Sequence, residues 1–207
     1  SIQADMSIKD IGNTLAQIPS VVALARQLKP RPGSTADCFA ARVESLAQRY
    51  GDRSAVVSEG QELSWRQLNG LANRYAKALK GVGMKRGDCT ALFMENRVDF
   101  LACLIALNKL GVITALINTN LHGKALGHCL EITEARWCIF GEERMAAIDE
   151  IRLAPATDLI KAWIFAPDSA NEPCPNWATD LAEESEYETP ANPPDTGDCK
   201  LQDRALY

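Results

Sequence analysis

Asn118, Thr119 and Asn120 are the residues of this chain whose types and position best suit contact with a ligand. They directly follow residues 112–117, a mostly apolar run typical of a strand that is buried on both faces of a parallel sheet. Ligands of open α/β sheets collect at the carboxyl ends of strands, and short side chains that donate and accept hydrogen bonds suit a loop lining a channel. The same residue types also form ordinary turns that bond their own backbone, so a plain turn is the alternative.

Other patterns that could carry chemistry are weaker. The glycines of GVGMKRGD close a helix and lead into a strand, whereas a dinucleotide-binding loop follows a strand and opens a helix. His122 and His128, near Cys129, are six residues apart, which does not place them on one helical face, so we predict no metal site. Neither a GxxxxGK[ST] nor a GxSxG motif occurs. We therefore predict no catalytic residue and no ATP-binding residue in this chain.

A strand–helix–strand unit must position the candidate loop. Residues 89–94 read as a strand, Asn96 can cap the following helix, and Asp99 adds negative charge to its first turn. Residues 100–107 are all apolar, so the helix is expected to be sandwiched, and Gly111 ends it. The unit predicts an α/β fold with a parallel sheet. The side chains that we expect to be almost fully buried are Leu92, Leu101, Ile105, Val112 and Leu116.

Further helices and strands flank this unit. A helical stripe over 39–50 is expected to be capped by Ser34 or Thr35, and residues 54–58 and 61–63 read as a small hairpin. Ser64 and Gln67 form a capping box that opens a strongly periodic helix reaching residue 82. The remaining predicted elements are helices at 124–132 and 142–151 and strands at 136–140 and 159–165.

The domain organisation follows from composition. Residues 1–33 read as an N-terminal helical arm, and residues 34–166 as the α/β subdomain flanked by helices. Residues 167–207 are acidic and proline-rich, which predicts an irregular connector with at most a short helix around Leu181, leading into a truncated second subdomain.

The overall composition excludes several classes of protein. The net charge of −5 argues against a nucleic-acid partner, and no run approaches the roughly 20 apolar residues of a membrane span. No secretory signal is visible at the N-terminus. The seven cysteines read as small buried hydrophobes in a reducing compartment, which favours the cytoplasm.

Three stretches together resemble the adenylate-forming acyl-CoA synthetases, in particular their fatty-acid-transport-protein or very-long-chain branch. They are LSWRQLNGLANRYAKAL at 63–79, GVGMKRGDCTALFMENRVDF at 81–100 and NKLGVITALINTNLHGKALGHCL at 108–130. The resemblance covers residues 35 to 165 and rests on the order and spacing of these pieces. Within it, Asn118–Thr119–Asn120–Leu121 matches the loop that follows the second core strand in that branch.

The resemblance implies a long- or very-long-chain fatty acyl-CoA ligase that converts a fatty acid and ATP to an acyl-adenylate and then transfers the acyl group to coenzyme A. The family's phosphate loop would follow a strand like the one starting at Ala205, so this sequence ends before it. The chain would then be an inactive N-terminal fragment, whose full-length enzyme uses ATP, Mg²⁺ and CoA, and Asn118, Thr119 and Asn120 would line its substrate or CoA channel.

Two other functions remain open at this point. One is a free-standing Rossmann-like or flavodoxin-like binding module, and the other is a non-catalytic interaction domain derived from the ligase fold. For the ligase, the expected partners are a fatty acid, CoA and the remainder of its own chain. A peripheral contact at the inner face of a membrane is also expected.

Overall fold

The computed structural model describes residues 38–58, 60–168 and 172–200. The chain divides into two compact units, Ser1–Gly33 and Ser34–Tyr207, and all of the described residues belong to the second. The predicted helical arm at 1–33 therefore lies outside the described residues. Within the part of the chain that the structure describes, no helix is long and apolar enough to cross a membrane.

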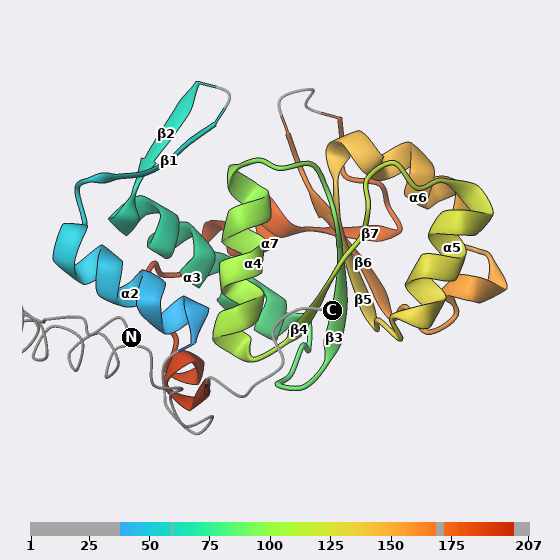
Figure 1. Cartoon of the computed structure of the whole chain (residues 1–207). Coiled ribbons are helices and arrows are strands. Elements are labelled where there is room, and N and C mark those ends of the chain that lie inside the picture. The colour runs from blue at the N-terminus through green and yellow to red at the C-terminus, as the bar shows by residue number, and fades with distance from the viewer. Residues whose placement is uncertain (1–37, 59, 169–171, 201–207) are drawn as a thin grey trace, which may run out of the picture. The chain divides into compact units, whose positions relative to one another are not determined.

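A five-stranded parallel sheet forms the centre of this unit, which confirms the predicted fold class (Figure 1). Its strand order is β4-β3-β5-β6-β7, so β4 and β7 are the two edges. The strands are β3 (Cys89–Phe93), β4 (Ile113–Leu116), β5 (Trp137–Gly141), β6 (Ala162–Ala166) and β7 (Ala178–Asp180). Because all of them run in the same direction, the loops that follow them lie together at the carboxyl ends of the strands. We call this end of the sheet its carboxyl edge, as distinct from the two edge strands.

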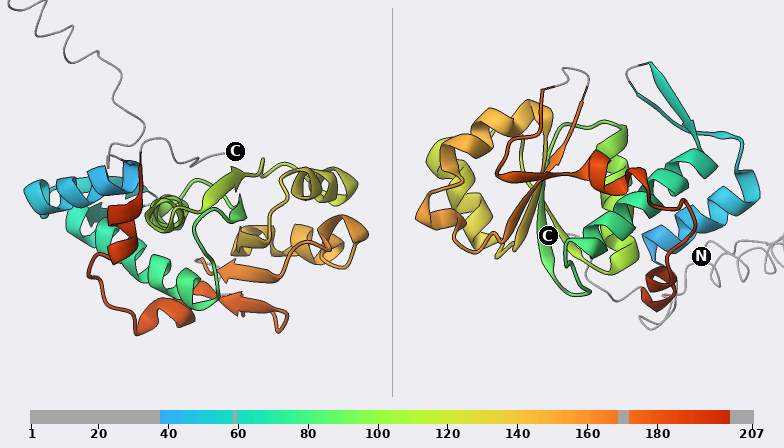
Figure 2. Two further views of the ribbon diagram at one scale, coloured as in Figure 1. Left: turned by 90° about the horizontal axis from the view of Figure 1, so that it is seen from below. Right: turned by 180° about the vertical axis from the view of Figure 1, so that it is seen from behind.

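Helices cover both faces of the sheet, as the two further views show (Figure 2). One apolar core contains residues of α2, α3, α4 and α7, and a second contains residues of α5 and α6. The helices are α2 (Phe39–Tyr50), α3 (Trp65–Gly81), α4 (Val98–Leu110), α5 (Gly123–Ile132), α6 (Met145–Ile151) and α7 (Leu181–Glu186). Three short 3-10 turns are η1 (Glu142–Arg144), η2 (Pro155–Thr157) and η3 (Pro194–Asp198).

Helix α4 begins and ends within one residue of the predicted positions. Gly111 has φ +68°, the left-handed conformation that glycine adopts without steric cost, and ends the helix as expected. The predicted cap Asn96 is wrong: the N-cap is Arg97, whose side chain makes no capping hydrogen bond. The Arg97 guanidinium instead donates to two main-chain carbonyls at the end of β6, those of Ala166 and Pro167.

Of the five side chains predicted to be almost fully buried in the strand–helix–strand unit, three are buried and two are not. Leu92, Ile105 and Val112 are buried as expected, whereas Leu101 is only partly buried. Leu116 is 43% exposed, which contradicts the prediction. Its strand β4 lies at the edge of the sheet and pairs only with β3 among the described strands, so one side of it lacks a neighbouring strand.

The N-terminal part of the described chain confirms the hairpin and one of the two predicted caps. Strands β1 (Ser54–Ser58) and β2 (Gln61–Ser64) pair antiparallel. The capping box opens α3, since the Ser64 N–H donates to Gln67 Oε1 at 2.8 Å and the Gln67 N–H donates to Ser64 Oγ at 3.3 Å. Helix α2 is not capped by Ser34 or Thr35, because its N-cap is Cys38, whose Sγ accepts a hydrogen bond from the Ala41 N–H at 3.4 Å.

Residues 172–200 pack against the subdomain. The short helix predicted around Leu181 is α7, and Asp180 caps it by accepting from the Ala182 N–H at 2.8 Å. Strand β7, directly before this helix, was not predicted from the sequence; it adds a fifth strand beside β6.

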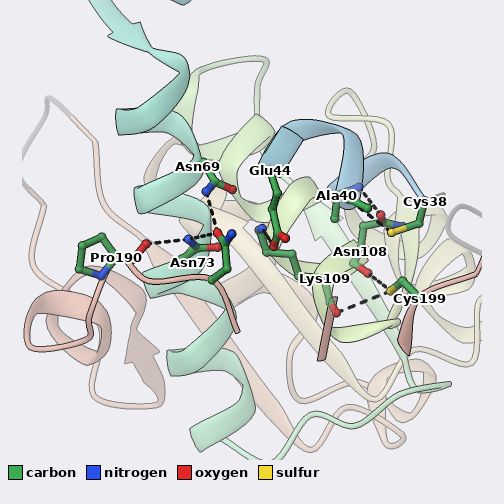
Figure 3. Close-up of polar contacts among 11 residues, drawn as sticks. Cys38, Ala40, Glu44, Asn69, Asn73, Asn108, Lys109, Pro190 and Cys199 are labelled. Carbon is green, nitrogen blue, oxygen red and sulfur yellow. Dashed lines mark hydrogen bonds and ion pairs between the residues drawn. The ribbon is translucent and has the colours of Figure 1, made fainter. Parts of the chain in front are cut away.

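Polar contacts hold the later part of this segment on α3 (Figure 3). Asn73 Nδ2 donates to the Pro190 carbonyl at 2.7 Å and to Asn192 Oδ1 at 2.9 Å, and Asn69 Nδ2 donates to Asn192 Oδ1 at 2.8 Å. Gly70 lies between the two asparagines, and a Cβ there would lie 3.2 Å from Pro190 Cβ. A larger residue at this position would therefore press against Pro190, and the proline-rich segment would have to shift by a few tenths of an ångström.

Candidate functional site

The three candidate residues follow β4 at the carboxyl edge of the sheet. Asn118 and Asn120 are exposed and Thr119 is half-buried. The Asn118 side chain accepts a hydrogen bond from the Asn120 N–H at 2.9 Å, and its carbonyl accepts one from the Leu121 N–H at 3.1 Å. The loop is thus a turn closed by its own first residue, and two of its amide side chains are open to solvent. That these side chains contact a ligand stays a prediction.

An arginine from the neighbouring turn binds this loop. Arg144, in η1 after β5, donates from Nη1 to the Thr119 carbonyl at 3.0 Å, and its Nη2 forms an ion pair with Glu95, which follows β3. The Glu95 N–H in turn donates to Glu143 Oε1 at 2.7 Å. The loops after three adjacent strands, β4, β3 and β5, are therefore joined by hydrogen bonds and one ion pair.

A second arginine joins the loops after β3 and β6. The Arg97 side chain is 7% exposed and donates to the carbonyls of Ala166 at 2.9 Å and Pro167 at 2.8 Å. The same guanidinium lies 3.3 Å from an Asp99 carboxylate oxygen and 3.2 Å from one of Asp168.

Buried acidic and phenolic groups complete this edge. Glu142, 5% exposed, accepts from the N–H groups of Asp168 at 2.5 Å and Glu172 at 2.9 Å, and so holds the chain after β6. The Tyr75 hydroxyl donates to Asp99 Oδ1 at 2.5 Å. Burial and the nearby Asp99 carboxylate raise the pKa of Tyr75, so this phenol stays protonated and acts as a donor.

Four residues of this network were not predicted from the sequence as site residues: Glu95, Arg97, Glu142 and Arg144. A signal was present, because each of these residues lies within four positions after the end of a predicted strand, the region in which ligands of α/β sheets collect. What the network can do chemically is to fix main-chain groups in place, since its charges are used on carbonyls, N–H groups and one another. Among the described residues, no group of three or more His, Cys, Asp or Glu side chains is arranged to hold a metal ion.

The glycine-rich stretch lies at the opposite edge of the sheet. Gly83 and Gly87 have φ values of +101° and +84°, and the Gly87 N–H donates to the Gly111 carbonyl at 2.9 Å. These glycines form the turn from α3 into β3 that the sequence predicted. A hollow of about 500 Å³ beside it is lined by Gly87, Asp88, Cys89, Ile113 and residues 132–134 and 136, at the amino ends of the strands.

Most of the chain matches one protein family. The family model described as AMP-binding enzyme matches residues 43–201, which include the whole sheet and the helices α3 to α7. The chain belongs to the AMP-binding enzyme family. This confirms the resemblance to adenylate-forming enzymes that the sequence suggested.

Relatives within this family carry fatty-acid names. The chain is 32% identical over 168 residues to long-chain fatty acid transport protein 1 of Bos taurus, covering 79% of this chain and 25% of the relative. It is 31% identical over 137 residues to the medium/long-chain-fatty-acid–CoA ligase FadD6 of Mycobacterium tuberculosis, covering 66% of this chain and 23% of the relative. The chain thus spans about a quarter of the length of these curated relatives.

Solved structures of AMP-binding enzymes share the fold. The N-terminal domain of FACL13 from Mycobacterium tuberculosis, determined with an inhibitor, aligns with a TM-score of 0.65 and 27% identity over 74% of this chain and 36% of that one. The anthranilate CoA ligase AuaEII, determined with anthranoyl-AMP, aligns with a TM-score of 0.69 over 78% of this chain and 30% of that one. At 21% identity, the latter similarity shows the fold alone.

Proposed function

We propose that this chain is the N-terminal part of a long- or very-long-chain fatty acyl-CoA ligase. The complete enzyme would join a fatty acid to CoA, with ATP converted to AMP and pyrophosphate, through an acyl-adenylate. The observation that carries this proposal is the match of residues 43–201 to the AMP-binding enzyme family, together with relatives named for long-chain fatty acids and their CoA ligation. The partners of the enzyme would be the fatty acid, CoA and the rest of its own chain.

The contribution of this chain to the reaction would be structural and positional. We infer that Asn118, Thr119 and Asn120 form part of the wall of the substrate or CoA channel, since they lie at the carboxyl edge of the sheet with exposed amides. Their amide and hydroxyl groups could bind the amide-rich pantetheine arm of CoA by hydrogen bonds. The chain alone is expected to be inactive.

The described residues do not fit a site for ATP and Mg²⁺. The carboxylates at the carboxyl edge bind arginines and main-chain N–H groups, and no group of three or more of the described residues is placed to hold a metal. We therefore assign no step through ATP or Mg²⁺ to these residues. Those groups would be held by parts of the longer protein, which leaves residues 34–166 as a supporting subdomain and residues 167–207 as the connection toward them.

The proposed location is the cytoplasm, with a peripheral contact at the inner face of a membrane. All seven cysteines are free and are buried or half-buried, which is typical of a reducing compartment. The relatives named as fatty acid transport proteins support a location close to a lipid substrate.

Separate assays of the two half-reactions test this proposal. In the longer protein that contains this chain, Asn120→Ala is expected to raise the KM for CoA about tenfold, the effect of one lost hydrogen bond of average strength or more. Fatty-acid-dependent pyrophosphate exchange, which reports adenylate formation alone, should change by less than about twofold.

Asn176→Ala is the matched control. Asn176 is also an exposed turn asparagine, but it precedes β7 and so lies at the opposite edge of the sheet. If Asn120→Ala lowers both half-reactions equally and also lowers the melting temperature, the loop is a structural turn that does not bind CoA. A longer protein without any fatty-acid-dependent pyrophosphate exchange would contradict the ligase itself.

A further inference from the structure

Arg144 lies where it can control the position of the Asn118–Asn120 loop. In the strand order β4-β3-β5, the loop follows β4 and Arg144 follows β5, so the arginine reaches across the end of β3. Neighbouring strands are about 4.8 Å apart, and the two ends that Arg144 connects are therefore separated by about 10 Å. This distance requires a long side chain that remains ordered.

The planar guanidinium can serve both neighbouring loops at once. Nη1 donates to the Thr119 carbonyl at 3.0 Å, and Nη2 pairs with the Glu95 carboxylate. The Arg144 side chain is only 21% exposed and its Nε is buried, so the guanidinium is directed into the loops and away from bulk solvent. A lysine has one nitrogen at its tip and cannot reproduce this two-sided contact.

Glu95 fixes the arginine from the β3 side. Its carboxylate pairs with Arg144, and its own N–H donates to Glu143 Oε1 at 2.7 Å, so residues 143 and 144 both hold the chain after β3. The turn of residues 118–121 makes its internal bonds through Asn118. Arg144 adds the contact that relates this turn to the neighbouring strands.

We propose that Arg144 is a positioning residue, which holds the Thr119 carbonyl so that the Asn118–Asn120 loop is fixed at the carboxyl edge of the sheet before CoA binds. The proposal rests on the proposed function for its consequence in catalysis, because a loop fixed in advance spares the cost of ordering it on binding. Arg144 itself is not expected to touch the reacting atoms.

Amide hydrogen exchange on the 207-residue chain tests the positioning directly. In Arg144→Met, the amides of Asn120 and Leu121, which donate to Asn118, should exchange about tenfold faster than in the unchanged chain, since a charge-assisted hydrogen bond is lost. Amides of β3 should keep their protection. Arg144→Lys and Glu95→Gln should give smaller increases, because each keeps part of the contact.

Arg152→Met is the matched control. Arg152 has a similarly exposed side chain, 24%, and also pairs with a carboxylate, that of Asp149 at 2.8 Å, but it is the C-cap of α6 and, within the part of the chain that the structure describes, makes no hydrogen bond or ion pair with the loop. Exchange at Asn120 and Leu121 should be unchanged in this variant. Unchanged exchange in Arg144→Met, with β3 still protected, would overturn the proposal. If Arg144→Met does not fold, unchanged exchange in both Arg144→Lys and Glu95→Gln would overturn it.

A kinetic readout in the longer protein separates positioning from general stability. Arg144→Met should raise the KM for CoA by about tenfold and Arg144→Lys by less, whereas pyrophosphate exchange should stay within about twofold in both variants. An equal loss in both half-reactions would contradict a role in holding the CoA loop. A longer protein that makes no acyl-CoA would contradict the proposed function, while the exchange experiment would still decide whether Arg144 holds the loop.

Discussion

The ion pair between Lys109 and Glu44 is the most sharply testable feature of the core (Figure 3). Lys109 Nζ on α4 lies 2.5 Å from Glu44 Oε1 on α2, and the two side chains are 0% and 17% exposed. Burial lowers the pKa of Lys109, and the hydrogen bond and charge of Glu44 oppose that change. Without its partner, Glu44 can still be solvated by water because it is partly exposed, whereas Lys109 is fully buried and cannot.

This difference predicts an asymmetric response to mutation. In Glu44→Ala, Lys109 must stay charged without a partner or lose its proton. Removing a proton at pH 7 from a group whose ordinary pKa is 10.5 costs about 5 kcal/mol, which sets the scale of the expected loss. We expect the free energy of unfolding to fall by about 3–5 kcal/mol. In Lys109→Met the remaining Glu44 can reach water and the methionine fills the space, so we expect about 1–3 kcal/mol.

The pH dependence of the loss identifies its cause. At pH 10 the neutralisation of Lys109 costs less than about 1 kcal/mol, so the penalty of Glu44→Ala should shrink toward that of Lys109→Met. Cys38 and Cys199 also lie close enough to influence Lys109, and both cysteines are retained in the parent and in the variants. The comparison therefore uses differences between proteins at one pH.

Urea unfolding followed by tryptophan fluorescence measures these differences, since the chain contains four tryptophans. Glu62→Ala, an exposed glutamate on β2, should change stability by less than about 0.5 kcal/mol and serves as the control. A loss below about 1 kcal/mol in Glu44→Ala at pH 7 would show that Lys109 is not buried as described, on the scale of the expected penalty. A penalty of equal size at pH 7 and pH 10 would rule out the deprotonation of Lys109 as its origin.

Two further predictions concern the sheet and its buried thiols. Ile105→Ala should lower stability by about 2–5 kcal/mol because the side chain is fully buried, whereas Leu116→Ala, at a 43% exposed position, should cost less than about 1 kcal/mol; similar losses in urea unfolding would contradict the assigned strand order. Burial raises the pKa of the Cys103 and Cys138 thiols above the ordinary value of 9.0, so the folded state keeps protons that the unfolded state releases above pH 9. Stability should therefore fall as the pH rises above 9, by about 1 kcal/mol per pH unit for each thiol, and the lowered pKa of Lys109 acts in the opposite direction. A Cys138→Ala variant whose stability falls as steeply between pH 8 and 10 as that of the parent would exclude this thiol as a contributor.

The sequence by itself determined the local elements and the family. Apolar periodicity, the capping box at Ser64 and the glycine stop at Gly111 are decided by neighbours within a few residues, and the structure confirms each of them. The all-apolar stretch 100–107 predicted a helix between two strands, and that helix is α4. The same local patterns supported the resemblance that the family match then confirmed.

Only the tertiary structure decided which side chains meet. Leu116 is exposed because β4 is an edge strand, and edge or centre is a property of strand order that an apolar run does not encode. Lys109 is buried because α2 supplies Glu44 from 65 residues away, and Arg144 finds Glu95 across 49 residues. Strand β7 is only three residues long, too short for a periodic pattern, and forms because β6 offers it an edge. These contacts join positions far apart along the chain, so their partners are fixed by the arrangement of the whole sheet and its helices, which short-range patterns do not specify.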